Sequence, residues 1–188
     1  MKLRNATERI IALLLTLILF PIVLVISVLI KLSSSGDIFF CSKRVGIENK
    51  IFLMPKFSTM RPDTPKVATH LLHDPEQYYT RVGSFLRKTS LDEIPQLLSI
   101  LKGDMSFIGP RPALFNQDDL IKLRTEKGIH QLMPGVTGWA QVNGRDELSI
   151  PVKVQFDEYY LKNRSWFLDL KIVFLTLLKV LGMIGVSH

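Results

Sequence analysis

The chain has 188 residues, which is enough for one domain with a hydrophobic core, or for a smaller domain plus a membrane element, and too few for two large domains. Lysine and arginine outnumber aspartate and glutamate by 24 to 17, and the formal net charge of +7 suits anionic partners such as phosphorylated metabolites, acidic lipid or nucleic acid. The single cysteine, Cys41, excludes an intrachain disulfide, and the four histidines are scattered without the spacing of a zinc site.

The N-terminal part of the sequence contains a long apolar run without charged side chains, residues 10–30. It is long enough to cross a hydrocarbon core of roughly 30 Å. Arg9 precedes it and Lys31 follows it, so the positive-inside rule gives no orientation. Pro21 lies in the middle, where it removes a backbone donor and predicts a kink. The residues therefore allow a spanning helix, a re-entrant helix that bends and returns through the same face, or a buried core helix.

Short strands and helices are expected after this run. Residues 38–40 predict a strand, and residues 51–57 predict a second strand or the start of a helix. From Tyr78 the apolar residues recur at helical spacing as far as the Thr89 boundary, and a further helix is expected to end at Gly103.

Two adjacent carboxylates, Asp92 and Glu93, stand where these helices meet. The pattern Ser90-x-x-Glu93 is typical of a helix capping box, so a structural interpretation competes with a catalytic one. Pro95 follows just past the first turn, where it removes a helical hydrogen bond. A local rule that is broken beside two carboxylates indicates a functional constraint.

The next segments are a loop, a surface helix and a glycine-rich stretch. Residues 103–112 predict a loop, because Pro110 and Pro112 flank Arg111 and rigidly present it. Residues 118–127 predict a polar surface helix with solvated charges. Residues 134–145 contain three glycines that permit tight turns or close backbone approach, but the pattern matches no known phosphate-binding loop.

Two helices are expected at the C-terminal end. Residues 154–161 predict a helix that carries Asp157. Residues 166–186 are strongly apolar, yet charged side chains such as Asp169 and Lys179 disfavour a second membrane crossing. This segment predicts either an amphipathic helix in the membrane interface or a helix that closes the core.

In this order, the motifs resemble those of the bacterial sugar transferase family, the small monotopic phosphoglycosyl transferases that begin lipid-linked glycan assembly on polyprenyl phosphate. The resemblance covers essentially the whole chain. It rests on the anchor and on the following stretches: Arg44-x-Gly46, Lys56-Phe57-x-Thr59-Met60, Ser90-Leu91-Asp92-Glu93, residues 103–112 and residues 134–145.

The resemblance implies a reaction. A sugar 1-phosphate would pass from a UDP-sugar to undecaprenyl phosphate with release of UMP, through a covalent intermediate on Asp92 and with Mg²⁺. Asp92 and Glu93 would be both the catalytic residues and the metal ligands, and Glu93 would assist the acceptor. This would be the first membrane step of surface glycan synthesis.

The resemblance also implies an architecture. The expected fold is α/β and mostly helical, with a re-entrant membrane helix bent at Pro21 over residues 1–32. Residues 33–188 would form a cytoplasmic catalytic domain with interfacial amphipathic helices at the bacterial inner membrane. A homodimer is compatible with apolar surface near the membrane.

The chemistry of the residues agrees with this reaction. A carboxylate can accept a phosphoryl group if it stays ionised, which a helix N-terminus and the neighbouring Arg87 and Lys88 would favour. Adjacent carboxylates attract Mg²⁺, and arginines offer forked donors to phosphate oxygens. The candidate substrate-binding residues are Lys56, Arg87, Arg111, Arg145 and Asp157.

Two other functions stay open from the residues. One is a membrane-associated phosphohydrolase that uses Asp92 with water as acceptor, and the other is a non-enzymatic membrane adaptor. A nucleic-acid partner is not expected, because the basic residues are scattered and no nucleic-acid-binding motif is present.

Overall fold

The computed structural model describes residues 2–65, 74–144 and 147–182. They form a mostly helical structure with two small two-stranded sheets, which confirms the predicted fold class. The helices and strands in chain order are α1 (Lys2–Ser33), β1 (Phe39–Val45), β2 (Ile51–Phe57), α2 (Arg81–Lys88), α3 (Leu97–Lys102), β3 (Ser106–Ile108), α4 (Asp118–Glu126), β4 (Gly135–Thr137), α5 (Trp139–Val142), α6 (Ile150–Asn163) and α7 (Trp166–Gly182). Short 3-10 helices are η1 (Ile47–Asn49), η3 (Pro75–Tyr78), η4 (Leu91–Gln96) and η5 (Ile129–Gln131).

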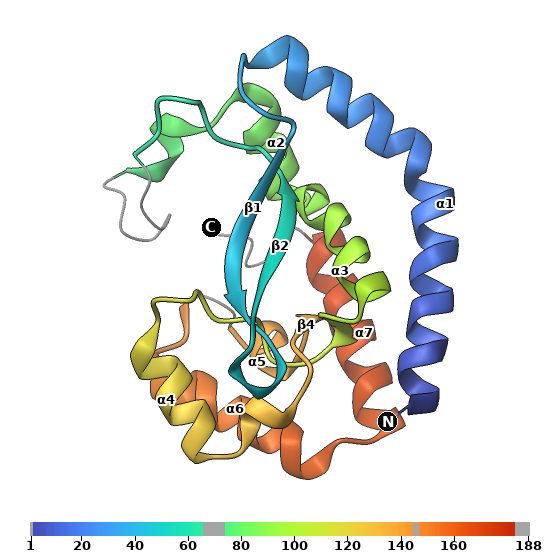
Figure 1. Cartoon of the computed structure of the whole chain (residues 1–188), viewed down its shortest axis with the longest axis vertical. Helices are drawn as coiled ribbons and strands as arrows, with labels where there is room; N and C mark the ends of the chain where they lie inside the picture. Colours follow the sequence, from blue (N-terminus) through green and yellow to red (C-terminus); the bar gives the residue numbers. More distant parts are fainter. Residues whose placement is uncertain (1, 66–73, 145–146, 183–188) are drawn as a thin grey trace.

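Helix α1 wraps around one side of the molecule and bends over its top (Figure 1). Pro21 lies inside the helix, where the missing N–H and the proline ring permit such a bend. Ala12, in the first half, packs with side chains of α3 and β2. Ile26 and Ile30, in the second half, pack against Phe57 and α2. Both halves of the bent helix therefore contact the same domain.

The outer surface of α1 is apolar. The most apolar 18-residue window of the stretch Ala6–Ser33 has a mean hydropathy of 3.2, and only 11 % of this window is buried against protein. It is the one helix in the described part of the chain whose length and composition would let it cross a membrane. An exposed apolar surface of this size supports a location at a membrane.

Strands β1 and β2 form an antiparallel hairpin, with Phe39 opposite Phe57 and Val45 opposite Ile51, and this pairing was not predicted from the sequence. The second segment is thus a strand and not the start of a helix. Met54 and Lys56 have cross-strand partners and lie on the same face of the hairpin. This face is turned toward the core, since Met54 is buried and Lys56 contacts Glu93 of η4. The hairpin thereby brings Lys56 to the carboxylate pair.

A second, parallel pair of strands lies where the sequence predicted only loop. Ser106 of β3 pairs with Gly135 of β4, so the loop assignment over residues 103–112 is wrong for three residues. The close approach depends on glycine, because a Cβ on Gly135 would lie 2.1 Å from the main-chain nitrogen of Gly109. The glycines of this region are used for main-chain packing.

Helix α7 has a buried face and an exposed apolar face. Ile172 is fully buried in the cluster that α7 shares with α4 and α6, and the Tyr160 hydroxyl donates to Asp169 at 2.7 Å. Trp166 and Phe167 are 75 % and 80 % exposed. The prediction that this segment closes the core is therefore confirmed, and the exposed aromatic side chains leave the interfacial location as a prediction.

Candidate active site

The carboxylate pair lies in η4, between α2 and α3. The predicted capping box is wrong: Ser90 adopts a left-handed conformation (φ 57°) and its side chain makes no capping hydrogen bond. A capping serine needs extended backbone angles to reach the first turn. Pro95 lies inside η4 and disfavours α-helical angles at Ile94, which is consistent with the short 3-10 helix found here.

Asp92 is a buried carboxylate, only 2 % exposed. Burial raises its pKa, and Glu93 acts in the same direction, while Lys56, Arg87 and Arg111 oppose the rise. The prediction that the surroundings of Asp92 favour its charged form is therefore wrong, because the loss of hydration raises its pKa more than the neighbouring cations lower it. Among the described residues, no group donates a hydrogen bond to Oδ1 of Asp92.

Glu93 is paired with two cations. Its Oε1 accepts a hydrogen bond from Nη2 of Arg111 at 3.0 Å and lies 3.8 Å from Nζ of Lys56. Burial lowers the pKa of Lys56 to about 8, although the carboxylates of Glu93 and Asp92 act against this shift. Lys56 and Arg111, predicted from distant motifs, are therefore brought to the same carboxylate.

Arg87 projects from the last turn of α2 and is held by two hydroxyl groups. Its Nε donates to Oγ1 of Thr59 at 2.9 Å and its Nη1 donates to the hydroxyl of Tyr79 at 2.8 Å. The guanidinium also lies 4.5 Å from the centre of the Tyr79 ring. These contacts fix a cation whose charge acts on Asp92.

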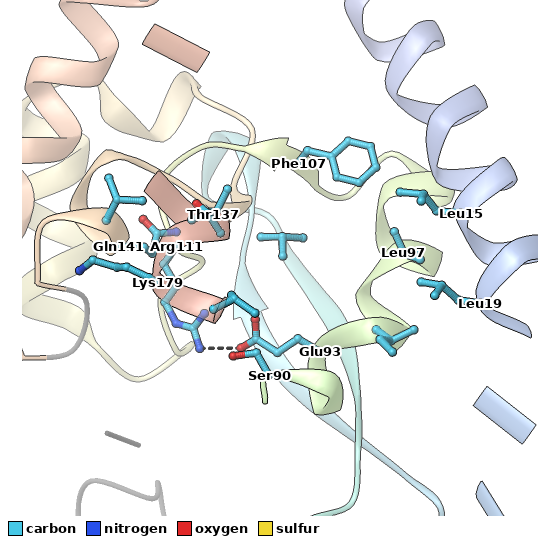
Figure 2. A pocket seen from close by; sticks show the side chains of 15 residues that line it. Leu15, Leu19, Ser90, Glu93, Leu97, Phe107, Arg111, Thr137, Gln141 and Lys179 are labelled. Carbon is cyan, nitrogen blue, oxygen red and sulfur yellow. Dashed lines mark hydrogen bonds and ion pairs between the residues drawn. The ribbon is translucent and has the colours of Figure 1, made fainter. Parts of the chain in front are cut away.

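A cavity of about 290 Å³ opens beside Glu93 and Arg111. Leu15 and Leu19 of α1 form one side, and Lys179 of α7 lies on the other (Figure 2). The complete lining is Leu15, Leu19, Ser90, Glu93, Ile94, Leu97, Phe107, Arg111, Val136, Thr137, Gln141, Val142, Thr176, Lys179 and Val180. The cavity is thus mostly apolar with charged groups along part of its wall.

Of the predicted site residues that the structure describes, Glu93 and Arg111 line this cavity, whereas Lys56, Arg87, Asp92 and Asp157 do not. Asp157 is 1 % exposed and forms an ion pair with Arg124, and neither residue lines the cavity. Arg145 lies outside the described residues. The expectation that all charges of residues 118–127 are solvated is wrong for Arg124, which is buried. Its position one turn after buried Leu120 is the signal that could have placed it on the inner face.

The carboxylate pair offers the oxygen donor atoms that a divalent cation such as Mg²⁺ binds. The described part of the chain contains no group of three or more His, Cys, Asp or Glu side chains placed to share a metal ion. Mg²⁺ does not require one, because it binds through one or two carboxylates together with phosphate oxygens and water. Asp92 and Glu93 supply two carboxylates, and the unpartnered Oδ1 of Asp92 is an acceptor of the kind such an ion needs.

Comparison with known proteins gives a consistent result. A family profile described as "Bacterial sugar transferase" matches residues 1–183. The chain is 43 % identical over 169 residues to the "Uncharacterized sugar transferase EpsL" of Bacillus subtilis (strain 168), covering 89 % of this chain and 81 % of that protein.

Two further relatives carry names that state a reaction. The chain is 38 % identical over 186 residues to the "UDP-glucose:undecaprenyl-phosphate glucose-1-phosphate transferase" of Escherichia coli (strain K12), which covers 94 % of this chain and 40 % of the relative. It is 39 % identical over 171 residues to the "UDP-N-acetylgalactosamine-undecaprenyl-phosphate N-acetylgalactosaminephosphotransferase" of Aeromonas hydrophila, which covers 88 % of this chain and 40 % of the relative. The chain therefore spans well under half of these two proteins.

Proposed function

The chain belongs to the bacterial sugar transferase family, and from this premise we propose that it transfers a sugar 1-phosphate from a UDP-sugar to undecaprenyl phosphate. The observation that carries the proposal is the position of Glu93, one member of the carboxylate pair, beside Arg111. Glu93 and Arg111 lie on the wall of an apolar cavity between α1 and α7, two helices with apolar outer surfaces. A soluble nucleotide donor and a lipid-bound phosphate can meet only at such a boundary.

In the first half of the reaction, Asp92 attacks the β-phosphorus of the donor. A bond forms between a carboxylate oxygen and phosphorus, the bond between phosphorus and the bridging oxygen breaks, and UMP leaves with that electron pair. Asp92 must become accessible for this step, since it is 2 % exposed. Lys56, Arg87 and Arg111 are the cations near enough to act on its charge, and they would stabilise the charge of the transferring phosphoryl group.

In the second half, the phosphate of the lipid acceptor attacks the same phosphorus and releases Asp92. We expect Glu93 to assist the acceptor, because it lines the cavity in which a lipid chain would lie. Leucines of α1 and α3, together with Phe107 and Val180, supply the apolar wall for that chain. The two half-reactions share one phosphorus-binding position.

Mg²⁺ would be held by Asp92 and Glu93, and when bound it would neutralise charge on the donor phosphates. Arg111 and Lys56 lie 3.0 and 3.8 Å from Glu93, and these ion pairs would keep its carboxylate in position for such a role. The protein would act at the cytoplasmic face of the bacterial inner membrane, where nucleotide sugars are available, and would start the assembly of a surface glycan.

The decisive experiment follows UMP release. Detergent- or nanodisc-held protein is incubated with Mg²⁺, undecaprenyl phosphate and a panel of UDP-sugars, and intact-protein mass spectrometry without acceptor looks for a phospho-sugar on Asp92. We expect UMP with one or a few donors, an adduct of the mass of the sugar phosphate, and loss of activity by at least about 10³-fold in Asp92→Ala, since covalent catalysis depends on the nucleophile.

Asp118→Asn is the matched control, because Asp118 is a carboxylate in the first turn of surface helix α4. It should keep full activity. Intact transfer by Asp92→Ala would contradict the proposal. Release of free sugar phosphate in the absence of lipid acceptor would instead support the phosphohydrolase.

A further inference from the structure

Arg111 lies in a loop, residues 110–113, that is held at four successive main-chain carbonyl groups. The first and the last accept hydrogen bonds from main-chain N–H groups of β4 and β1, each at 2.9 Å. The third accepts one from Nη1 of Arg44 at 3.2 Å. The second, which belongs to Arg111 itself, accepts one from Nη1 of Arg124 at 2.8 Å. The flanking prolines have no N–H, so the loop relies on its carbonyl groups for attachment.

Arg124 is in turn fixed by Asp157. Its Nε and Nη2 donate to the same oxygen, Oδ2, at 3.0 and 2.6 Å. Arg124 is 7 % exposed and Asp157 is 1 % exposed, so neither charge has much water to replace its partner. A buried guanidinium keeps its orientation when a carboxylate occupies one edge, and its remaining N–H groups then point in a defined direction.

We propose that Arg124 and Asp157 are positioning residues for Arg111. The pair connects α6 and α4 to the main chain of Arg111, whose side chain donates to Oε1 of Glu93 at 3.0 Å. Asp157 thus acts on the reaction through Arg124 and the loop, and does not bind substrate itself. This inference rests on the proposed function, in which Arg111 contacts a phosphate group.

The chemistry makes this connection sensitive. A hydrogen bond from a charged donor is stronger than one from a neutral donor, so Arg124 is a firm attachment for the carbonyl of Arg111. A displacement of a catalytic group by about 1 Å can lower a rate by about 10²-fold. The main chain that carries Arg111 therefore has to be held closely.

The first test compares two substitutions on α6. Asp157→Asn preserves size and removes the charge, and we expect kcat to fall by about 10- to 100-fold while KM for the UDP-sugar changes less than about threefold. Glu158→Gln is the matched control, since Glu158 joins α6 to the end of α4 through Lys127 at 3.3 Å and, among the described residues, forms its ion pairs with lysines outside the loop. Lys127 is the residue directly after α4. Glu158→Gln should change kcat by less than about twofold, as expected for a surface ion pair.

The second test asks whether the effect depends on Arg111. In an Arg111→Lys background, Asp157→Asn should lower kcat by less than about threefold, because coupled residues are not additive. An equal loss in both backgrounds would overturn the proposal, and so would a raised KM that is independent of Arg111. Arg124→Lys, which keeps the charge but loses the fork, should follow Asp157→Asn and serves as the measured variant if that protein does not fold.

Hydrogen exchange provides a readout that does not depend on activity. Peptides that cover residues 105–115 should exchange faster in Asp157→Asn than in wild type and should be unchanged in Glu158→Gln. Unchanged exchange in Asp157→Asn would overturn the positioning role. Absence of UMP release by the wild-type protein would contradict the proposed function alone, since the exchange result would still stand.

Discussion

Among the single residues of the site, Lys56 has the pKa that most directly predicts a measurable effect. Its pKa is lowered to about 8. The ammonium group loses its charge as the pH rises through this value. If that charge binds a donor phosphate, binding of the donor weakens over the same range. We expect kcat/KM for the UDP-sugar to fall about tenfold per pH unit above about pH 8, because kcat/KM reports groups of the free enzyme. Lys56→Arg should remove this fall, since a guanidinium does not lose its proton in this range.

Stability should change in the opposite direction. Between about pH 8 and 10.5 the unfolded chain binds a proton at Lys56 that the folded chain has lost, so the contribution of Lys56 to stability rises with pH there. A parallel loss of folded protein would therefore not explain a fall in kcat/KM. Lys88→Arg, at an exposed position in the last turn of α2, is the control and should leave the profile unchanged. A profile that Lys56→Arg does not alter would contradict a role for this charge.

For single residues, the sequence predicts which chemical groups form the site better than it predicts how deeply each side chain is buried. The residues of the reaction stand in short motifs, and Lys56, Arg111 and Glu93 do meet. The raised pKa of Asp92 and the buried role of Arg124 were not predicted, because both depend on which distant segments cover a side chain. Burial by distant segments is set by the tertiary fold, and a linear pattern carries little information about it.

Among the elements, α2 packs against the main chain of residue 59 at a position where only glycine fits. A Cβ on Gly83 would lie 1.9 Å from the carbonyl oxygen of Thr59, and the same threonine receives the hydrogen bond of Arg87. Gly83→Ala must therefore push α2 away from residue 59. We expect a loss of about 2 kcal/mol in the free energy of unfolding, because overpacking outweighs the gain of about 1 kcal/mol in helix propensity.

The measurement is thermal unfolding in detergent, where this loss corresponds to a fall in Tm of about 4–8 °C for a chain of this size. Ser84→Ala, at the next position of the same helix, should change Tm by less than about 2 °C. Activity of Gly83→Ala should also fall, since Arg87 moves with the helix. A Tm equal to that of the wild-type protein would contradict this prediction, because it would show that the main chain of residue 59 moves aside without loss of stability.

Elements with their own local signals were the ones predicted well. The apolar and aromatic residues 38–40 predicted a strand that the structure contains as part of β1, and α3 ends, as predicted, at Gly103, which has a φ of 90°. Strand β3 was missed because three residues between a glycine turn and two prolines carry too short a pattern. The strand exists because β4 lies beside it, and that pairing joins residues 106 and 135.

At the scale of the whole molecule, the bent helix α1 and the outer face of α7 both expose apolar side chains. Arg9, near the beginning of α1, donates to the carbonyl of Lys102 at 3.4 Å, and Ile30, near its end, is buried against the same domain. A helix that crossed a bilayer would place its ends on opposite faces, about 30 Å apart or more. Contacts at both ends therefore favour a helix that enters the membrane and returns.

This arrangement predicts that both ends of α1 face the same compartment as the catalytic domain. In a Cys41→Ser background, single cysteines replace Thr7, Ser35 or Lys50, which are exposed before α1 enters the membrane, after it leaves, and in the hairpin turn. We expect a membrane-impermeant maleimide to label all three in inside-out vesicles and none in right-side-out vesicles. Because Lys50 reports the side of the domain in the same preparation, labelling of Thr7→Cys from the opposite side to Lys50→Cys would establish a spanning helix. Pro21→Ala should shift the helix toward that spanning state, since it restores the backbone donor that the bend lacks.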